Sequence, residues 1–265
     1  MQDLLLNTWQ PRLSTRALGQ GEALLLPETD STNLQLRKLA LAGAPHGSLC
    51  AADMQTAGKG RLGRVWHSPA GQGLWLSVLL RPKLSPAAAP LVTLIAAMAM
   101  AQAVQEAASI PCGIKWPNDL VTGGKKLCGI LLEISADVER IHHLIVGTGL
   151  NVKRGAYPAE LAHQATSIED IAPPPERGAI LAAYLNALEK LLDRLETGGF
   201  EAIHADYMAQ CVTMGSRVQV IGAERFTGTA EAIDETGALL VRDESGVLRR
   251  VLSGDVSVRG VMGYV

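Results

Sequence analysis

Gly58-Lys59-Gly60-Arg61-Leu62-Gly63-Arg64 is the stretch that decides how this 265-residue sequence is interpreted. Three glycines alternate with three cations between two apolar runs, 48–53 and 73–81, which predict strands entering and leaving the loop. Glycine allows a backbone to turn tightly and to approach a ligand closely. Lysine and arginine supply positive charge and hydrogen-bond donors for oxyanions. The loop therefore predicts an anionic ligand that carries phosphate.

The spacing of Gly58, Gly60 and Gly63 matches the Gly-x-Gly-x-x-Gly fingerprint of dinucleotide-binding folds, but its context does not. In those folds the glycines open a helix whose N-terminus holds the pyrophosphate. Here they run into Trp66, Ser68-Pro69 and a strand, which argues against a nicotinamide or flavin fold. The sequence contains no Gly-x-x-x-x-Gly-Lys-Ser/Thr motif, which excludes a P-loop. A surface loop with solvated cations is the alternative for this segment taken alone.

The composition is that of a globular protein, with 48% hydrophobic residues and room for a sizeable core. Its formal net charge of −2 makes the chain as a whole a poor binder of polyanions, so we expect no nucleic-acid partner. The four cysteines form no Cys-x-x-Cys pair and the N-terminal residues lack the features of a signal peptide. We therefore expect a cytoplasmic protein with reduced thiols.

One uncharged segment, 84–105, is long enough to span a bilayer. It contains two prolines, several polar residues and much alanine. A buried, alanine-rich helix over 86–108 is therefore the preferred interpretation, and we expect no membrane span.

Helical and strand patterns over residues 1–211 predict an α+β domain with a mixed sheet flanked by helices. Thr32 and Gln35 have capping-box spacing at the start of one helix, which Gly43 ends. Further strands are expected at 22–26, 127–134 and 141–146, a hairpin turn at Gly123-Gly124, and further helices at 177–195 and 200–211.

The pattern of apolar residues and glycines changes near residue 215. From there, short apolar runs are separated by glycines at regular spacing. Such a pattern is typical of a small β-barrel. We therefore expect two domains, 1–211 and 212–265.

A second constellation of polar residues begins at Lys115-Trp116-Pro117. A lysine on an apolar strand is unusual because lysine resists burial, so this one could face a ligand oxyanion. Asn118 and Asp119, taken alone, are more simply explained as a turn after the proline. Lys126 follows the predicted hairpin tip, where a solvated lysine is the ordinary outcome.

Taken together, these segments resemble the biotin protein ligase family in order and spacing. Glu28–Asn33 resembles the opening of its biotin pocket, and Gln55–Ser68 resembles its glycine- and arginine-rich adenylate loop. Lys115–Asp119, Lys126–Glu133 and Gly147–Val152 resemble three further blocks of the family. The resemblance runs from about Glu28 to Arg259. It implies the class II synthetase-like catalytic domain of biotin and lipoate ligases, followed by an SH3-like C-terminal barrel.

The resemblance also implies two half-reactions. The carboxylate of biotin attacks the α-phosphate of ATP, with Mg²⁺, and gives biotinyl-AMP and pyrophosphate. A lysine of a biotin carboxyl carrier protein then attacks the mixed anhydride and releases AMP. Neither step needs a protein nucleophile, but both need aligned reactants and stabilised phosphate charge.

On the same resemblance, residues of this chain are assigned to the two substrates. Lys126 and Arg61 are expected to be catalytic, with Lys126 bridging the biotin carboxyl oxygen and the α-phosphate. The expected biotin-binding residues are Ser31, Thr32, Asn33, Gln55, Gly58, Lys59, Gly60, Arg61 and Lys126. The expected ATP-binding residues are Lys59, Arg61, Arg64, Trp66, Asn118, Asp119, Lys126 and Asn151, and Asp119 is also expected to hold Mg²⁺. For Trp66, a place in the core is the alternative to stacking near adenine.

Two departures from the family pattern stand out. The family loop usually has arginine at Lys59 and often a second basic residue at Leu62, so loop closure is expected to be weaker here. Only 27 residues precede Glu28, too few for the helix-turn-helix of many bacterial relatives. We therefore expect the ligase-only form, and a homodimer is one option because many relatives dimerise through their sheets.

Three other functions stay open from sequence alone. Lipoate ligases and octanoyl transferases share the Lys115–Asp119 block, although Ser31–Asn33 and the glycine-cation loop favour biotin. A non-catalytic biotin sensor or transcriptional regulator is disfavoured by the net charge and the missing DNA-binding module. Residues 215–260 could instead act as an independent binding module. Binding of both acids, pyrophosphate release and truncation after Cys211 would separate these readings.

Overall fold

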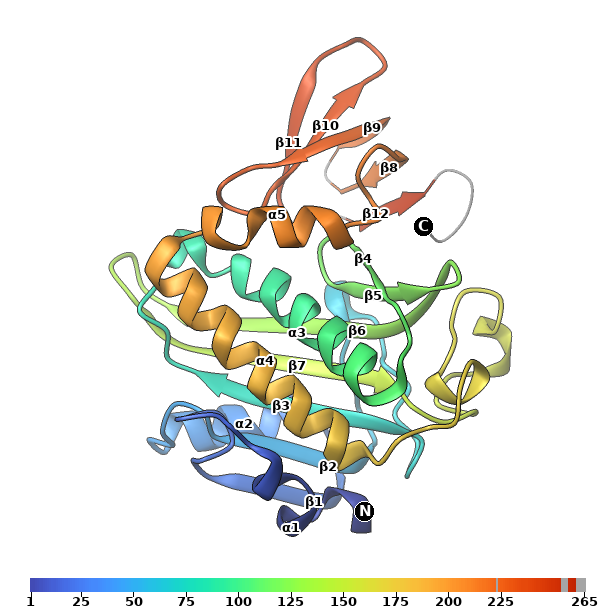
Figure 1. Ribbon diagram of the computed structural model, residues 1–265. Coiled ribbons are helices and arrows are strands. Elements are labelled where there is room, and N and C mark those ends of the chain that lie inside the picture. Colours follow the sequence, from blue (N-terminus) through green and yellow to red (C-terminus); the bar gives the residue numbers. More distant parts are fainter. Residues whose placement is uncertain (223, 254–256, 261–265) are drawn as a thin grey trace.

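A seven-stranded sheet forms the centre of the protein, seen here in a computed structural model that describes residues 1–222, 224–253 and 257–260 (Figure 1). Its strand order is β1-β2-β3-β7-β6-β5-β4. The strands are β1 (Ala23–Thr29), β2 (Leu49–Gln55), β3 (Gly73–Leu80), β4 (Gly113–Lys115), β5 (Asp119–Thr122), β6 (Lys125–Ala136) and β7 (Ile141–Asn151). Only β1 and β2 pair in parallel, and the other pairs are antiparallel. The predicted mixed sheet is confirmed.

β7 extends five residues beyond the predicted strand end at residue 146. The reason is that Gly147 and Gly149 stay in the ladder, where β3 pairs on one side and β6 on the other. Glycine weakens an isolated strand, but here two neighbouring strands supply the missing stabilisation. The hairpin at Gly123-Gly124 is present as expected, with both residues at positive φ.

Helices cover both faces of the central sheet. α3 (Leu91–Ala108) and α4 (Arg177–Gly198) pack on one face together with α5 (Glu201–Gln210), and α2 (Thr32–Leu41) packs on the other (Figure 1). A short α1 (Leu6–Trp9) lies against α4.

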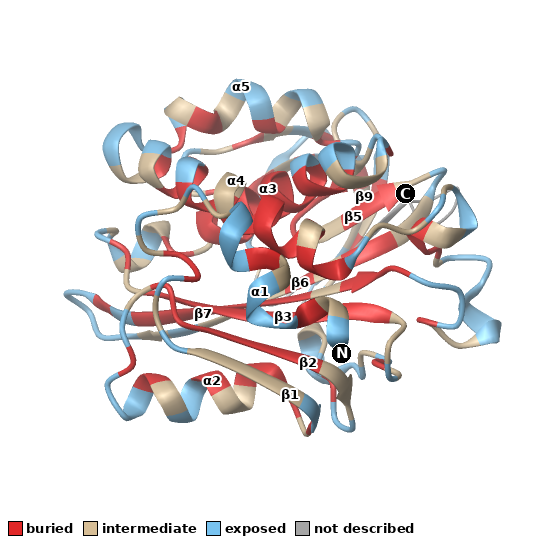
Figure 2. Cartoon of the chain, turned by 60° about the horizontal axis from the view of Figure 1, so that its bottom comes forward, coloured by how far each residue is buried: buried red, intermediate tan, exposed pale blue. Residues whose placement is uncertain are grey.

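α3 is the uncharged segment that could have been mistaken for a membrane span. By length and hydropathy 86–108 passes that test, but 78% of its most apolar window is buried inside the protein. Most of α3 is buried beside α4 over the sheet (Figure 2), and its exposed residues, Gln102, Gln105 and Glu106, lie in its C-terminal part. The predicted core helix is confirmed.

The start of α2 differs from the expected capping box. Thr32 is the first helical residue and Ser31 occupies the N-cap, with no side-chain capping bond. The Gln35 amide donates instead to Asp30 Oδ1 at 2.7 Å. The predicted Thr32–Gln35 box is therefore wrong, because Asp30 competes for the glutamine and the helix begins one residue earlier.

Alternation along β3 and β7 gives the sheet two chemically different faces. Leu76, Val78 and Val146 point into the large core beneath α3 and α4. Ser77, Gly147 and Gly149 occupy the intervening positions and face the side of α2. Small residues on that face leave space above the sheet beside the N-terminus of α2.

The C-terminal strands form a second, antiparallel sheet. Its order is β11-β10-β9-β8-β12. The strands are β8 (Arg217–Ile221), β9 (Arg225–Ile233), β10 (Leu239–Asp243), β11 (Leu248–Val251) and β12 (Ser257–Gly260). Within the described residues no ladder joins β11 to β12, so the sheet is open where a closed barrel was expected. Residues 254–256 and 261–265, on either side of β12, lie outside the described residues.

This second sheet packs through its apolar side chains on the larger domain, close to α3 and Trp116. Val218, Ile233 and Leu239 belong to the same buried cluster as α3. The Trp116 indole donates from Nε1 to the Gly237 carbonyl at 3.0 Å. The Lys115–Asp119 segment is thus held from above by the C-terminal sheet.

Candidate functional site

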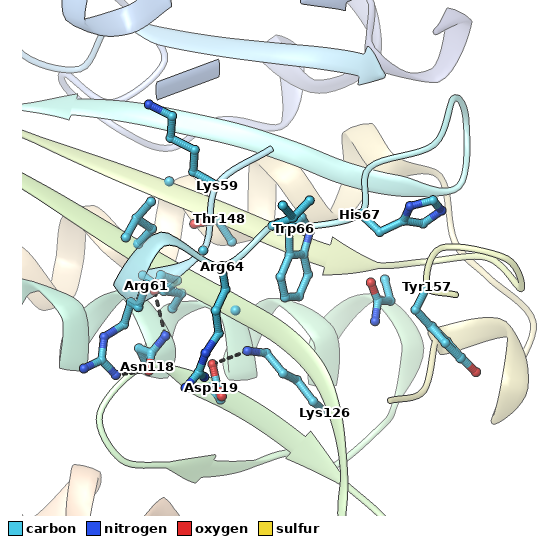
Figure 3. A pocket seen from close by; sticks show the side chains of 18 of the residues that line it. Lys59, Arg61, Arg64, Trp66, His67, Asn118, Asp119, Lys126, Thr148 and Tyr157 are labelled. Carbon is cyan, nitrogen blue, oxygen red and sulfur yellow. Dashed lines mark hydrogen bonds and ion pairs between the residues drawn. The ribbon is translucent and has the colours of Figure 1, made fainter. Parts of the chain in front are cut away.

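A cavity of about 650 Å³ opens above the small-residue face of the sheet. It is bounded by the start of α2, the glycine-cation loop, the β4–β5 turn, β6, β7 and the segment 156–165 (Figure 3). All but one of the residues predicted to bind substrates line it: Ser31, Thr32, Asn33, Gln55, Lys59, Gly60, Arg61, Arg64, Trp66, Asn118, Asp119, Lys126 and Asn151. The exception is Gly58. Segments that are far apart in sequence therefore meet in one place.

One end of the cavity, formed by Ser31, Thr32, Asn33 and Gln55, is uncharged, and we call it the neutral end. The Thr32 backbone N–H donates to Gln55 Oε1 at 2.9 Å, and the Gln55 amide donates to Ser68 Oγ at 2.9 Å. Asn33 is 4% exposed, yet its Nδ2 has no partner within the described residues. A buried N–H without a partner is costly. The neutral end is therefore built to meet a small polar ligand that offers an acceptor.

The glycine-cation loop folds back on itself as a tight turn. The Trp66 N–H donates to the Gly58 carbonyl at 2.9 Å, and the Gly60 N–H donates to the Arg64 carbonyl at 2.7 Å. The tip is a short 3₁₀ turn, Arg61–Gly63, inside which Leu62 has a φ of 56°. This left-handed conformation is unfavourable for leucine.

Gly58 serves a different purpose from the one expected. It is buried and does not line the cavity. A methyl group in place of its hydrogen would lie 2.4 Å from the Trp66 carbonyl oxygen and 2.7 Å from Ser68 Oγ. Glycine is needed here because the loop packs closely on its own exit.

The other end of the cavity carries Lys59, Arg61, Arg64, Asp119 and Lys126, and we call it the charged end. Lys126 Nζ lies 2.6 Å from Asp119 Oδ1, with the two side chains 23% and 14% exposed. Figure 3 shows Arg64 directed towards this pair and Lys59 directed away from it. Lys126 therefore faces the cavity and is not the freely solvated lysine of a hairpin tip.

Two segments hold the backbone of Lys126 in place. Its N–H donates to the Gln164 carbonyl at 2.8 Å, and its carbonyl accepts from the Thr166 N–H at 2.9 Å. The Asn151 amide, predicted to contact nucleotide, donates to the Thr166 carbonyl at 2.9 Å. Asn151 thus fixes the strand-like contact beside Lys126 while lining the cavity.

Arg61 reaches across the cavity to two other elements. Its Nη1 donates to Asn118 Oδ1 at 2.9 Å, and its Nη2 donates to the Ser253 carbonyl in the C-terminal sheet. Burial lowers the pKa of the Arg61 guanidinium from its usual value, but arginine stays charged at neutral pH. The predicted turn residue Asn118 is 8% exposed and is held by Arg61 and by the Ile130 carbonyl.

Trp66 lies flat on the floor of the cavity rather than in the core. A methyl group at Gly149 would lie 2.3 Å from its Nε1, and one at Gly129 would lie 2.9 Å from its ring. Gly129 and Gly149 are directly paired on β6 and β7. Lys126 Nζ lies 5.1 Å from the centre of the indole, within reach of a cation–π contact.

No group of three His, Cys, Asp or Glu side chains that could hold a metal occurs in the described part of the chain. Asp119, the expected Mg²⁺ ligand, is paired with Lys126, and Asn118 Oδ1 accepts from Arg61. Mg²⁺ is usually bound through one or two carboxylates together with substrate phosphates and waters. The described lining of the cavity therefore offers Mg²⁺ a single carboxylate, that of Asp119.

Sequence reasoning missed two parts of the site. The segment 156–165 lines the cavity with Tyr157, Pro158 and Gln164, and its irregular, polar sequence gave no signal. Ser77 supports the neutral end from beneath and is fully buried. A signal for Ser77 did exist, because it is the one polar residue in the apolar run Leu74–Leu80.

Two family models match this chain. The biotin/lipoate A/B protein ligase family matches residues 25–151, and the biotin protein ligase C-terminal domain matches residues 213–259. The first range covers the central sheet except for the first two residues of β1, and the second covers the C-terminal sheet except for the last residue of β12.

Individual proteins are similar over most of the chain. The bifunctional ligase/repressor BirA of Bacillus subtilis is 36% identical over 250 residues, covering 93% of this chain and 76% of that protein. The biotin--[acetyl-CoA-carboxylase] ligase of Mycobacterium tuberculosis is 35% identical over 240 residues, covering 88% and 87%. The structure of an Aquifex aeolicus biotin protein ligase in complex with biotin and ATP superposes with a TM-score of 0.78 at 31% identity, covering 90% of this chain and 99% of that one.

Proposed function

The chain belongs to the biotin protein ligase family, and we propose that the cavity between α2 and the C-terminal sheet carries out both half-reactions of that family. The activity is the ATP-dependent conversion of biotin to biotinyl-AMP, followed by transfer of biotin to a lysine of a carboxyl carrier protein. The observation that carries the proposal is that one cavity is lined both by the uncharged polar residues of the neutral end and by the charged residues Arg61, Asp119 and Lys126.

The neutral end suits the ureido ring of biotin. A ureido group offers one carbonyl acceptor and two N–H donors, and the site offers hydroxyl and amide groups of Ser31, Thr32, Asn33 and Gln55. A pocket built around such hydrogen bonds rejects analogues that lack them, because its own buried polar groups would then lose their partners. This chemistry supports biotin over lipoate, whose dithiolane ring carries no such donors.

The charged end suits the carboxylate and the α-phosphate. Lys126 contacts Asp119 in the structure and would exchange that carboxylate for the oxygens of the reacting groups. The step joins a biotin carboxylate oxygen to the α-phosphorus and breaks the bond to pyrophosphate. Negative charge builds up on the α-phosphate oxygens, and a fixed cation there lowers the barrier. Arg61, held by Asn118, would retain the adenylate until the acceptor lysine arrives.

Trp66 and the nucleotide occupy neighbouring space. We assign Trp66 to packing against the nucleotide, since its ring already lies in the cavity on Gly129 and Gly149. Once Asp119 has separated from Lys126, its carboxylate would bind the Mg²⁺ that accompanies ATP.

The C-terminal sheet supports this site through two contacts. Trp116 donates to Gly237, and Arg61 donates to Ser253. We therefore propose that residues 212–265 form a second structural unit, with an SH3-like barrel as its complete form, which helps to close the nucleotide end.

A single experiment tests the proposed function. The full chain is incubated with biotin, MgATP and a biotin carboxyl carrier domain, and the acceptor is then weighed by mass spectrometry. One added biotinyl group per acceptor is expected, together with pyrophosphate and AMP. Pyrophosphate release with lipoate but not with biotin would contradict the proposal, and release with neither would indicate a non-catalytic binder.

A further inference from the structure

The glycine-cation loop is the outer part of an irregular two-stranded ribbon that leaves the central sheet between β2 and β3. Backbone hydrogen bonds cross this ribbon from its base to its tip, and they join residues 53 and 71, 55 and 68, 58 and 66, and 60 and 64. Near the base, the Ala57 N–H also donates to the Asp30 carbonyl, just after β1. A two-stranded ribbon has little stability of its own. The position of its tip therefore depends on how firmly its base is held.

A single arginine behind the sheet holds the base of the ribbon. Arg177 is the first residue of α4, on the face of the sheet opposite α2, and it is almost fully buried. Its Nη2 donates to Asp53 Oδ1 on β2 at 2.8 Å, and its Nη1 donates to the Gly73 carbonyl at the start of β3 at 3.1 Å. The chain enters the ribbon at Asp53 and leaves it at Gly73. One guanidinium therefore connects the two ends of the segment that carries the loop.

The third partner of Arg177 lies outside the ribbon. Asp3 belongs to the N-terminal turn Gln2–Leu4, and its two carboxylate oxygens accept from Arg177 Nε and Nη2 at 2.9 and 2.6 Å. This bidentate pair already balances the charge of the arginine. The contacts to Asp53 and Gly73 are additional, and they are the ones that reach the ribbon.

The place of Arg177 in α4 is not explained by the needs of the helix. A positive charge at the N-terminus of a helix opposes the helix dipole. A buried ion pair is often no more stabilising than apolar side chains of similar volume. What the arginine supplies here is a rigid fork of donors that joins three separate segments of the chain.

The ribbon is held at its tip as well as at its base. Arg61 at the tip donates to Asn118 Oδ1 and to the Ser253 carbonyl. Because the two strands of the ribbon are bonded to each other from base to tip, a shift at the base moves the tip. Such a shift would weaken both bonds of Arg61.

We propose that Arg177 and Asp53 are positioning residues that hold the glycine-cation loop over the cavity and so slow the escape of the acyl-adenylate. This inference rests on the proposed function, which supplies the adenylate. It deepens that function by identifying what holds the loop from the far side of the sheet. Neither residue lines the cavity, so both act through the loop.

The variants Asp53→Ala and Asp3→Ala are a matched pair. Each removes one carboxylate from the same arginine and one contact to the Met1 amino group, but only Asp53 belongs to the ribbon. Asp3→Ala loses two bonds to Arg177 and Asp53→Ala loses one, so the free energy of unfolding should fall at least as far in Asp3→Ala. Urea unfolding of the full chain measures this cost.

Two rates then report on the loop. The escape of biotinyl-AMP, made on the full chain from labelled biotin and MgATP and chased with unlabelled biotin, should be roughly tenfold faster in Asp53→Ala, because a charge-assisted hydrogen bond to the ribbon is lost. Cleavage after Lys59 by endoproteinase Lys-C, without ligand, should rise by a similar factor. In Asp3→Ala both rates should stay within about twofold of those of the unaltered chain.

Asp53→Asn is the conservative variant. Its amide oxygen can still accept from Arg177 Nη2, so it should restore most of the retention, to within about threefold of the unaltered chain. Arg177→Lys gives a second measurement if Asp53→Ala does not fold. One ammonium group cannot span Asp3, Asp53 and Gly73 in the same geometry, so the adenylate should escape about as fast as in Asp53→Ala.

Three other results are distinguishable. Faster escape in Asp3→Ala and Asp53→Ala alike, in step with the loss of stability, would show that the network only supports the fold and would overturn the inference. Escape from Asp53→Ala at the rate of the unaltered chain would overturn it as well. If the unaltered chain makes no biotinyl-AMP, the proposed function fails, and the Lys-C cleavage rates alone then decide whether Asp53 holds the loop.

Discussion

The neutral and charged ends of the cavity satisfy their polar groups in opposite ways. At the neutral end, Gln55 and Asn33 are held by fixed neighbours, and Asn33 Nδ2 is buried with no partner among the described residues. At the charged end, Lys126 and Asp119 contact each other and must separate before either can serve a substrate. The neutral end is therefore preformed for its ligand. At the charged end, the ligand must first displace the ion pair between Lys126 and Asp119.

The variant Lys126→Ala gives the strongest test of this difference between the neutral and the charged end. The adenylation rate should fall by a factor of ~10² or more, because a fixed cation is lost where the transition state gains charge. Biotin affinity should change much less, because the neutral end is untouched. Pyrophosphate release and biotin calorimetry measure the two quantities separately.

Lys125→Ala is the control for that variant. Its Nζ donates to the Ala162 carbonyl at the surface, 2.7 Å away, and not into the cavity. In Lys125→Ala, the adenylation rate and the biotin affinity should both match those of the unaltered chain. An unchanged adenylation rate in Lys126→Ala would remove Lys126 from the chemistry.

Arg61→Gly should show what retains the intermediate at the charged end. Loss of its two bonds, to Asn118 and Ser253, should speed the escape of biotinyl-AMP roughly tenfold or more, since each is a charge-assisted hydrogen bond. Escaped adenylate reacts with exposed lysines, so biotin on added bystander albumin gives the readout. Arg140→Gly, at an exposed turn, is the control. Equal labelling of albumin by both variants would contradict the role of Arg61.

The ion pairs of Arg177, at the start of α4, give a smaller effect that depends on pH. Arg177 is 3% exposed and binds Asp3, Asp53 and the Gly73 carbonyl, which ties β2 to the start of β3. Hydrogen bonds from Arg177 lower the pKa of Asp3 from 3.8 to about 2. A lowered pKa stabilises the fold above the ordinary value, and this contribution is lost as pH falls from 3.8 towards 2.

Asp3→Asn should therefore reduce the free energy of unfolding by about 1 kcal/mol at pH 7, a value kept low because Asp3 is partly exposed. The difference from the unaltered chain should shrink as pH falls from 3.8 towards 2. Urea unfolding at pH 7, 4 and 2.5 measures it. Asp206→Asn, which removes an exposed surface pair with Arg194, should have almost no effect at any of these pH values. A difference as large at pH 2.5 as at pH 7 would show that the two Asp3 bonds act independently of charge.

The smallest expected effect concerns the tip of the glycine-cation loop. Leu62 has a φ of 56°, and asparagine tolerates this conformation better than leucine. Leu62→Asn should slow cleavage after Lys59 by endoproteinase Lys-C by about two- to fivefold, because the observed turn opens less often. Cleavage after exposed Lys83 in the same digest is the internal control. Faster cleavage after Lys59 would mean that the loop prefers another conformation.

Much of this site could be predicted from sequence, because ligand chemistry demands particular residues in recognisable blocks. Lys126, Arg61 and Gln55 all line the cavity as expected. What escaped prediction depends on contacts between distant segments. Ser77 matters only because β3 places it under α2, and the glycines of β7 stay in the ladder only because β3 and β6 both pair with them.

Other errors came from competition between local groups. The predicted capping box was wrong because the Gln35 amide donates to Asp30 Oδ1. Residue spacing alone does not indicate which acceptor the glutamine will use. Gly58 looked like a ligand-facing glycine, but its lack of a side chain serves packing against the Trp66 carbonyl and Ser68. The regularly spaced glycines after residue 215 correctly predicted short strands. They do not indicate whether the sheet that those strands form closes into a barrel.

The apolar character of α3 has a consequence for biosynthesis. Its main packing partners are α4, α5, β4, β5 and β6, all of which are translated after it. A nascent polypeptide that has emerged only through residue 108 therefore carries an apolar helix, with Glu106 as its one charged residue, before these elements can cover it. Chaperone capture at that stage, and aggregation of chains stopped before α4, follow from the order in which the ribosome releases these elements.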